Sequence, residues 1–377
     1  MGRELIRAYR RIVVKVGTHS LTDERGELRY EKFEQVVADV ADAVRTGHEV
    51  ILVSSGAIAL GAFLLGWRRD LLTLPEKQAA AAVGQTQLMK AYAECFAERG
   101  LAVGQILLTR DDLDDRRRYV HLSNTLETLL RHRILPIVNE NDSVAVEEIR
   151  VGDNDTLAAA LAGAITADLV ALLTDVEGLY DQNPRLHPDA RLISEVHELT
   201  PEIWALAEGA GTSVGTGGMR TKLEAAHIAT SMGVDLVVLR AGEGRLGRFL
   251  AGEPVGTLFH RRPAPRGKKR WLQAVARPSG TLVVDDGAVD ALVRGKKSLL
   301  VPGVRRVEGT FEEGDVVLVV SEDGLPVAKG LVRYASEELR LLLQRKATGQ
   351  SVARLPEVVH RDELVLVERV ANAPSDA

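Results

Sequence analysis

The feature that most constrains the fold is an alternation of short apolar runs and longer alanine-rich stretches, from the start of the chain to about residue 260. The runs are rich in β-branched residues, which favour strands, whereas the stretches carry apolar residues at helical spacing. The clearest strand candidates are residues 12–16, 49–53, 134–138, 168–173 and 234–239. The clearest helix candidates are residues 31–45, 75–99, 120–131, 156–165 and 219–231. This order predicts an α/β fold, a three-layer αβα sandwich with a mostly parallel open sheet.

Composition excludes several classes of protein. Lysine and arginine number 48 and aspartate and glutamate 53, so the net charge of −5 argues against coating nucleic acid or anionic lipid by charge alone. Cys95 is the single cysteine, which excludes an internal disulfide or a multi-cysteine zinc site and fits a reducing compartment. The sequence shows no signal-peptide pattern and no apolar window of the ~18 residues that a membrane span needs, so we expect a cytoplasmic protein.

A basic segment divides the chain. Residues 261–270 contain six basic residues, two prolines and one glycine, a composition that predicts a linker outside any packed element. After it, short strand-like runs alternate with glycine and aspartate turns, which predicts a small, mainly β domain. The predicted organisation is a first domain over residues 1–260, the linker, and a second domain with a tail over residues 271–377.

The residues that follow each strand are the candidates for chemistry, because ligands of parallel sheets bind at the carboxyl ends of the strands. Lys15 lies in the first run, directly before Gly17, Thr18 and Ser20. A buried ammonium group needs an anionic partner, and small neighbouring residues let a phosphate approach it. The alternative is a lysine on an edge strand whose ammonium group reaches solvent.

Two further loops are rich in polar residues. Ser54 and Ser55 end the second run, where a helix start suits a carboxylate or phosphate, although the serines also suit simple helix capping. Amide and carboxylate residues follow the third run at 139–142 and recur at 153–155, where an alanine-rich helix is predicted to begin. A helix needs one capping residue, so this many polar side chains indicate a polar ligand, with capping alone as the alternative.

A fourth region joins Thr174 and Asp175, at the end of a strand candidate, with the glycine-rich residues 215–218 that precede Lys222. A glycine-rich turn into a helix with an early lysine suits the bridging phosphates of a nucleotide. For the glycine cluster alone, the alternative is a flexible lid. Two lysines from separate loops, together with an acidic helix start, indicate a site for phosphate chemistry.

In order and spacing, these motifs resemble the glutamate 5-kinase family of the amino-acid kinase superfamily. The matching segments include IVVKVGTHSLT, VSSGAIALG, PIVNENDSV, VGDNDTLAA, LLTDVEGLYDQNPR, GTGGMRTK and GTLFH. Beyond the linker, residues 280–317 resemble a PUA domain, a module appended to many bacterial members. His19 is a departure, because the family usually has serine at that position. The resemblance covers nearly the whole chain.

The resemblance implies transfer of the γ-phosphoryl group of ATP to the side-chain carboxylate of L-glutamate, giving L-glutamyl 5-phosphate in the first step of proline biosynthesis. It implies that Lys15 and Lys222 flank the transferred group and that Asp155, the third catalytic residue, orients both ammonium groups. The amino-acid ligands that it implies are Ser55, Asp142 and Asn154. The nucleotide ligands that it implies are Lys15, Thr174, Asp175, Thr216, Gly217, Gly218, Met219, Arg220, Thr221 and Lys222.

The chemistry agrees with these roles. The attacking carboxylate is already ionised at neutral pH, so the reaction needs alignment and charge neutralisation rather than a general base. Mg²⁺ is expected to arrive with ATP through phosphate oxygens and water, since the sequence shows no dedicated metal site. Asp142, helped by Glu140, would favour the free ammonium group of glutamate, unless these carboxylates pair with an arginine such as Arg150.

Partners and alternatives also follow from the resemblance. Family members are commonly homo-oligomers inhibited by proline, and their labile product passes to a glutamyl phosphate reductase. Within the same chemistry, the alternative is an acetylglutamate kinase or an aspartokinase. In a different class, the alternative is an RNA-binding protein that acts through its PUA domain. Residues 271–377 carry a net charge of −2, which disfavours nucleic acid as a partner of that domain.

Overall fold

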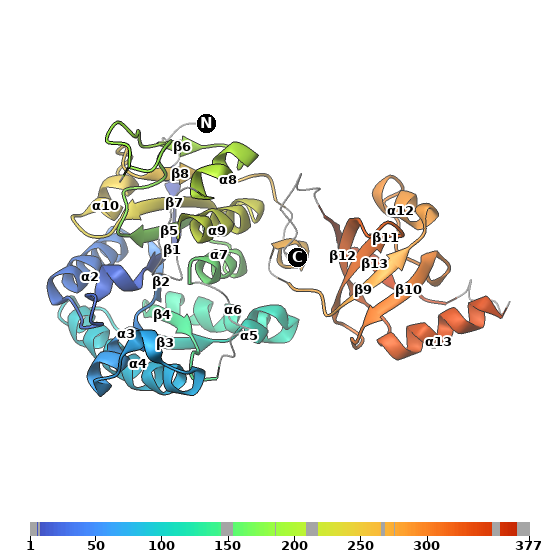
Figure 1. The fold of residues 1–377 in the computed structure, drawn as a ribbon, viewed down its shortest axis with the longest axis horizontal. Helices are drawn as coiled ribbons and strands as arrows, with labels where there is room; N and C mark the ends of the chain where they lie inside the picture. Colours follow the sequence, from blue (N-terminus) through green and yellow to red (C-terminus); the bar gives the residue numbers. More distant parts are fainter. Residues whose placement is uncertain are drawn as a thin grey trace. The chain divides into compact units, whose positions relative to one another are not determined.

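An eight-stranded sheet is the frame of the first of two units into which the chain folds (Figure 1). The units comprise Met1–Ala264 and Pro265–Ala377, so the division falls inside the predicted linker. The structure is a computed structural model. It describes residues 6, 8–144, 154–184, 186–208, 218–264, 268–274, 276–348 and 355–367.

The first sheet has the strand order β3-β4-β2-β1-β5-β7-β8-β6. Its strands are β1 (Arg11–Val16), β2 (Glu49–Ser54), β3 (Val103–Leu108), β4 (Leu135–Glu140), β5 (Leu169–Thr174), β6 (Glu195–Val196), β7 (Asp235–Arg240) and β8 (Thr257–Phe259). All pairs of neighbouring strands are parallel except β7 and β8, which are antiparallel. The predicted α/β fold is confirmed, and each of the five strand candidates is present within two residues at either end.

Helices cover both faces of this sheet (Figure 1). They are α1 (Thr18–Leu21), α2 (Tyr30–Arg45), α3 (Ala57–Leu65), the 3-10 helix η2 (Arg69–Leu71), α4 (Leu74–Ala97), α5 (Arg110–Asp114), α6 (Arg116–Arg131), α7 (Asn154–Ala164), α8 (Pro201–Glu208), α9 (Met219–Ser231) and α10 (Arg245–Leu250). Val14 and Val16 of β1 share one apolar core with α2, α4 and α10. Because side chains alternate along a strand, Val13 and Lys15 point to the other face, where α7 packs beside α9.

Two glycines let α3 and α4 pack backbone to backbone. A Cβ atom added to Gly61 of α3 would lie 1.8 Å from the carbonyl oxygen of Ala80, and one added to Gly84 of α4 would lie 1.9 Å from that of Ala57. Both distances are far below van der Waals contact, so only glycine fits at either position. Since α3 begins directly after the loop that follows β2, this close packing also fixes that loop at the carboxyl edge of the sheet.

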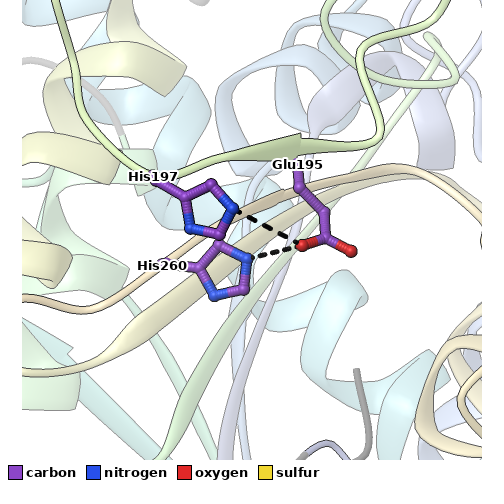
Figure 2. Close-up of side chains that lie close together, drawn as sticks. All are labelled: Glu195, His197 and His260. Atoms are coloured by element: carbon purple, nitrogen blue, oxygen red, sulfur yellow. Dashed lines mark hydrogen bonds and ion pairs between the residues drawn. The ribbon is translucent and has the colours of Figure 1, made fainter. Parts of the chain in front are cut away.

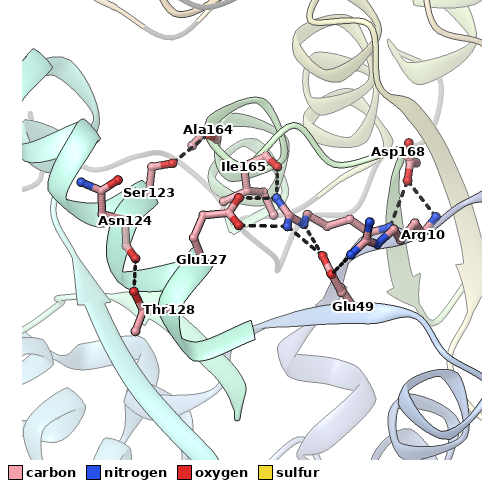
Figure 3. Close-up of polar contacts among 10 residues, drawn as sticks. Arg10, Glu49, Ser123, Asn124, Glu127, Thr128, Ala164, Ile165 and Asp168 are labelled. Atoms are coloured by element: carbon pink, nitrogen blue, oxygen red, sulfur yellow. Dashed lines mark hydrogen bonds and ion pairs between the residues drawn. The ribbon is translucent and has the colours of Figure 1, made fainter. Parts of the chain in front are cut away.

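Ion pairs tie the opposite, amino-terminal ends of the strands together. Arg10 donates from its side chain to Glu49 and from its backbone to Asp168, each at 2.8 Å (Figure 3). Arg11 pairs with Glu49 and with Glu127 of α6. A cavity of about 870 Å³ opens at this edge and is lined in part by Arg11 and Glu127. None of the predicted catalytic residues lines it, so this cavity is separate from the site described below.

The second unit contains a five-stranded sheet of order β10-β9-β11-β12-β13, which confirms the predicted mainly β character. Its strands are β9 (Gly280–Val284), β10 (Val304–Gly309), β11 (Val316–Ser321), β12 (Pro326–Val332) and β13 (Val359–Leu366). Its helices are α11 (Lys268–Ala274), α12 (Asp286–Val293), the 3-10 helix η4 (Val301–Gly303) and α13 (Ser336–Ala347). Among the described residues of both units, no helix has the length and apolar character needed to cross a membrane.

The prediction that residues 261–270 belong to no packed element is wrong at its carboxyl end. Residues 268–270 begin α11, which packs on β13 and buries Trp271. Lys268 Nζ lies 2.7 Å from Glu363 Oε1, so this lysine forms an ion pair within the second unit. The prediction rested on the prolines and the high charge of this segment. Lysine and arginine are nevertheless good helix formers when apolar residues follow them.

Gly84→Ala tests the close contact between α3 and α4. The added methyl group overlaps the backbone of α3, so we expect the variant to lose about 3 kcal/mol of stability and its melting temperature to fall by several degrees. Gly247→Ala in α10 is the matched control, because a Cβ atom there meets nothing within 4 Å. Equal melting temperatures for the two variants would contradict this description of the packing.

Candidate functional site

A buried cluster of three charged side chains lies at the carboxyl edge of the first sheet. Lys15 Nζ is 2.7 Å from Asp155 Oδ1, and Lys222 Nζ is 3.2 Å from Asp155 Oδ2, so one carboxylate pairs with two ammonium groups. The Asp155 side chain is completely buried, and each lysine side chain is only 7% exposed. The structure therefore brings together the three residues that the sequence predicts to be catalytic.

Lys15 reaches this cluster because β1 is a central strand. Its partners on the two neighbouring strands are Val53 of β2 and Leu172 of β5. Val14 and Val16 occupy the other face of the sheet, so the Lys15 side chain points towards α7. The alternative of an edge-strand lysine that reaches solvent is wrong, because β1 is paired on both sides and the side chain is buried.

Asp155 lies in the first turn of α7, and Lys222 lies in the first turns of the adjacent helix α9. Burial alone would raise the pKa of the Asp155 carboxyl, but the nearby charges of Lys15 and Lys222 outweigh burial and hold this pKa below its usual value. Thr221 also contributes a hydroxyl 3.3 Å from Asp155 Oδ2. The carboxylate is therefore ionised and paired with both ammonium groups.

A row of amide side chains continues the site from α7 towards α4. Asn154 Nδ2 donates to Ser55 Oγ at 2.7 Å and to Asn139 Oδ1 at 3.0 Å. Asn139 Nδ2 in turn donates to Gln85 Oε1 of α4 at 2.9 Å. The alternative that Ser54 and Ser55 cap α3 is wrong, because the N-cap is Gly56, with a φ of +105°, and no side chain caps that helix. Ser55 and Asn154 therefore lie side by side, next to the charge cluster.

Asn154 also has an acceptor without a partner. Its Oδ1 atom is buried and makes no hydrogen bond to any residue that the structure describes. Nδ2, rather than Oδ1, faces the Ser54 carbonyl oxygen at 3.0 Å, because a carbonyl oxygen can only accept. A buried acceptor of this kind costs free energy unless a ligand donates to it. The site can thus receive a donor such as an ammonium group.

Asp142, the third predicted ligand of the amino acid, lies in the turn that follows β4 and is half-buried. The same turn is tied to β3 by a hydrogen bond from the Asn141 backbone to the carbonyl oxygen of Leu108, at 2.7 Å. Arg150, the alternative partner for this carboxylate, is outside the described residues. The role of Asp142 stays a prediction.

Apart from Lys15 on β1, the described residues that the sequence predicts as nucleotide ligands lie at the end of β5 and at the start of α9. Thr174 ends β5 and donates to Asp175 at 3.0 Å, and the exposed Asp175 begins the next loop. Gly218 is the N-cap of α9. The next four predicted ligands form the first turn of that helix: Met219, Arg220, Thr221 and Lys222. Thr216 and Gly217 are outside the described residues.

Sequence reasoning missed Gln85 and Tyr92 of α4. Gln85 accepts from Asn139, and the hydroxyl of Tyr92 lies 3.0 Å from Ser54 Oγ, so α4 supports both polar loops. Both side chains are buried, and burial raises the pKa of the Tyr92 hydroxyl. The available signal was Gln85 within the alanine-rich stretch of residues 79–91, since a polar residue on a buried helix face needs a partner.

Comparison with known proteins agrees with this arrangement. The amino acid kinase family matches residues 10–240, and the PUA domain matches residues 280–349. Glutamate 5-kinase from Carboxydothermus hydrogenoformans is 46% identical over 373 residues, which covers 97% of this chain and 100% of that protein. Glutamate 5-kinase from Myxococcus xanthus is 46% identical over 376 residues, with 97% and 98% covered. The chain belongs to the glutamate 5-kinase family.

A solved structure supports the fold of this glutamate 5-kinase family member. Carbamate kinase from Giardia lamblia, bound to AMP-PNP, superposes with a TM-score of 0.51 at 18% identity. The match covers 68% of this chain and 100% of the carbamate kinase. At that identity the likeness concerns the fold alone.

Asp155→Asn tests the charge cluster. The variant leaves two buried ammonium groups without a counter-charge, so we expect a loss of about 3–5 kcal/mol at neutral pH. Because the pKa of Asp155 is lowered in the folded state, its contribution is present above the unfolded pKa of roughly 3.9 and is lost as pH falls through the folded pKa. The difference in melting temperature between wild type and variant should therefore become smaller from neutral to acid pH. A difference that stays constant would contradict the ion pairs.

Proposed function

We propose that this chain transfers the γ-phosphoryl group of ATP to the side-chain carboxylate of L-glutamate, as the first step of proline biosynthesis. The observation that carries the proposal is the pairing of Lys15 and Lys222 with the buried Asp155 at the carboxyl edge of the sheet. Two fixed positive charges from separate elements suit a phosphoryl group in transfer. Relatives that cover almost the whole chain are named glutamate 5-kinases, which supports glutamate as the acceptor.

The mechanism needs no proton transfer. A carboxylate oxygen of glutamate attacks the γ-phosphorus while the bond between that phosphorus and the β–γ bridging oxygen breaks, so ADP leaves with the bonding electrons. Lys15 and Lys222 offset the negative charge on the transferred group, and Asp155 holds both ammonium groups in place before the substrates bind. The attacking oxygen is already ionised, so this mechanism needs no general base. Asp155, which is paired with two ammonium groups, is therefore not required to accept a proton.

MgATP would lie over the end of β5 and the start of α9. In this proposal Thr174, Asp175 and the first turn of α9 bind the nucleotide, with Thr216 and Gly217 on the glycine-rich segment that precedes the helix. Backbone N–H groups at the start of a thirteen-residue helix favour the negative charge of the phosphates. Mg²⁺ would arrive with the nucleotide and would help to neutralise the charge of its phosphates.

Glutamate would lie between the charge cluster and the amide row. Ser55 and Asn154 are within hydrogen-bonding distance of each other and next to Asp155, so a bound amino acid would contact both. The buried Oδ1 atom of Asn154 would accept from the substrate ammonium group, and Asp142 would supply a compensating negative charge. This arrangement favours free glutamate over an N-acylated analogue, which carries no ammonium group.

The alternative of an RNA-binding protein is not favoured. The relatives named glutamate 5-kinases span the second unit as well as the first, so that unit accompanies the kinase in them. We retain as predictions the cytoplasmic location, the homo-oligomeric state, the inhibition by proline and the passage of the product to a glutamyl phosphate reductase.

Trapping of the product with hydroxylamine tests the proposed reaction. With ATP and Mg²⁺, we expect an acyl hydroxamate to form from L-glutamate, because an acyl phosphate reacts readily with this nucleophile. N-acetyl-L-glutamate and L-aspartate serve as the matched comparisons for the alternative kinases. Formation of hydroxamate from either comparison in preference to L-glutamate would overturn the assignment of the substrate.

Lys222→Met tests the role of the second ammonium group. Removal of one preorganised charge partner costs about 2.7–4 kcal/mol in the transition state, so we expect kcat to fall by a factor of about 10²–10³. Lys222→Arg should recover only part of this loss, because a planar guanidinium group does not replace a compact ammonium group. Lys90→Met, on an exposed position of α4, is the control. A kcat within tenfold of wild type for Lys222→Met would remove Lys222 from catalysis.

Asp142→Ala tests recognition of the amino acid. Loss of a charged partner of the ammonium group is expected to raise the KM for glutamate by about 10- to 100-fold, with little change in the KM for ATP. Steady-state kinetics with each substrate varied in turn measure the two constants. Asp189→Ala, at an exposed position, is the control. An unchanged KM for glutamate would place Asp142 outside the site.

A further inference from the structure

Three side chains with metal-binding atoms meet at the edge of the first sheet, away from the proposed kinase site. They are Glu195 of β6, His197 directly after it and His260 directly after β8 (Figure 2). One ligand atom from each residue lies within 4.8 Å of those of the other two. Among the described residues, this is the group of histidine, cysteine and carboxylate side chains that meets this spacing.

The backbone holds the three residues on one face. β6 pairs in parallel with β8 in the register Glu195 with Leu258 and Val196 with Phe259, so the next positions, His197 and His260, also face each other. The His260 N–H donates to the Val196 carbonyl oxygen at 2.9 Å, which continues the ladder to this point. Since side chains alternate along a strand, Glu195 and His197 project from the same face.

The ligand atoms of the three side chains lie close together. Nε2 of His260 lies 2.9 Å from Glu195 Oε2, and Nε2 of His197 lies 3.9 Å from the same oxygen. The two imidazole rings are stacked with centroids 4.2 Å apart and planes 7° apart (Figure 2). One ion can lie in the plane of both rings only after the exposed His197 ring turns out of this stack. Ligand bonds of about 2.0–2.2 Å in a tetrahedral site separate neighbouring donors by about 3.3 Å. The distances from Glu195 Oε2 to the two Nε2 atoms, 2.9 Å and 3.9 Å, lie on either side of this value.

An ion pair between Glu195 and His260 accounts for only part of this arrangement. It does not require His197, whose side chain is 69% exposed and nevertheless lies over the His260 ring. Two imidazoles and one carboxylate are a common set of ligands for Zn²⁺, with a fourth position for water. Mg²⁺ and Ca²⁺ prefer oxygen ligands and are poorly suited to two nitrogens.

We infer that Glu195, His197 and His260 bind one late first-row divalent cation, of which Zn²⁺ is the best match. Binding uses one lone pair from each of the two imidazoles, so a ligating nitrogen carries no proton when the ion is bound. The ion would join β8 to β6, a strand of only two residues at the edge of the sheet. The bound ion would therefore stabilise the pairing of β6 with β8. This site is independent of the Mg²⁺ that accompanies ATP.

The test uses the full chain, stripped of metal with a chelator and kept in excess Mg²⁺ without nucleotide. Titration with ZnCl₂ against a chromophoric chelator should show one tight equivalent for wild type. His197→Ala and His260→Ala should each weaken binding at least tenfold, which corresponds to about 1.4 kcal/mol. His187→Ala, at another exposed histidine of the same unit, should bind as wild type does. CoCl₂ gives a second readout, since imidazole ligation changes its visible spectrum.

Thermal melting distinguishes Zn²⁺ bound at the proposed site from Zn²⁺ bound adventitiously elsewhere. Zn²⁺ should raise the melting temperature of wild type and of His187→Ala, but not that of the double variant His197→Ala/His260→Ala. The exposed His197 can be replaced without loss of the fold, so the single variant remains informative if the double variant unfolds. Absence of a tight equivalent in wild type, or equal affinity in His197→Ala and His187→Ala, would overturn the proposal.

Discussion

One buried carboxylate with two ammonium partners is the interaction on which the candidate site depends. A charge as fully buried as that of Asp155 is tolerated only with partners at short range, so Lys15 of β1 and Lys222 of α9 must both reach the start of α7. The three charges leave one net positive charge in a place that excludes water, where its attraction for phosphate is strong. The contacts that stabilise the buried Asp155 therefore also hold the two ammonium groups close together.

The order of the strands explains how distant residues share this site. β1 lies between β2 and β5 in a parallel sheet, so the loops after these three strands open at one edge. Helix α4 supports that edge through Gln85 and Tyr92, while Gly61 and Gly84 allow α3 to approach closely enough to fix the serine loop. The packing of α3 and α4 thus determines where the polar groups lie.

The sequence predicts the parts of the structure that follow from local periodicity. Strands and helices alternate so regularly that the α/β fold could be predicted from periodicity, whereas the meeting of Lys15 with Asp155 was predicted from the resemblance to the glutamate 5-kinase family. Contacts such as Asn139 with Gln85 could not, because they depend on how one helix rotates over the sheet. The pairing of Glu195 with His260 joins residues 65 positions apart on two very short strands that the periodicity does not reveal. Helix α11 was not predicted because the prolines and the high charge of residues 261–270 indicated a linker, and α11 begins inside that segment.

The central claim is that Lys15 and Lys222 act on one phosphoryl group. A crystal structure of the protein with ADP, Mg²⁺, L-glutamate and a metal fluoride that mimics the transferred phosphoryl group tests it most directly. The account predicts both Nζ atoms within hydrogen-bonding distance of that fluoride, with Asp155 still between them. A fluoride bound elsewhere, or contacted by only one of the two lysines, would contradict it.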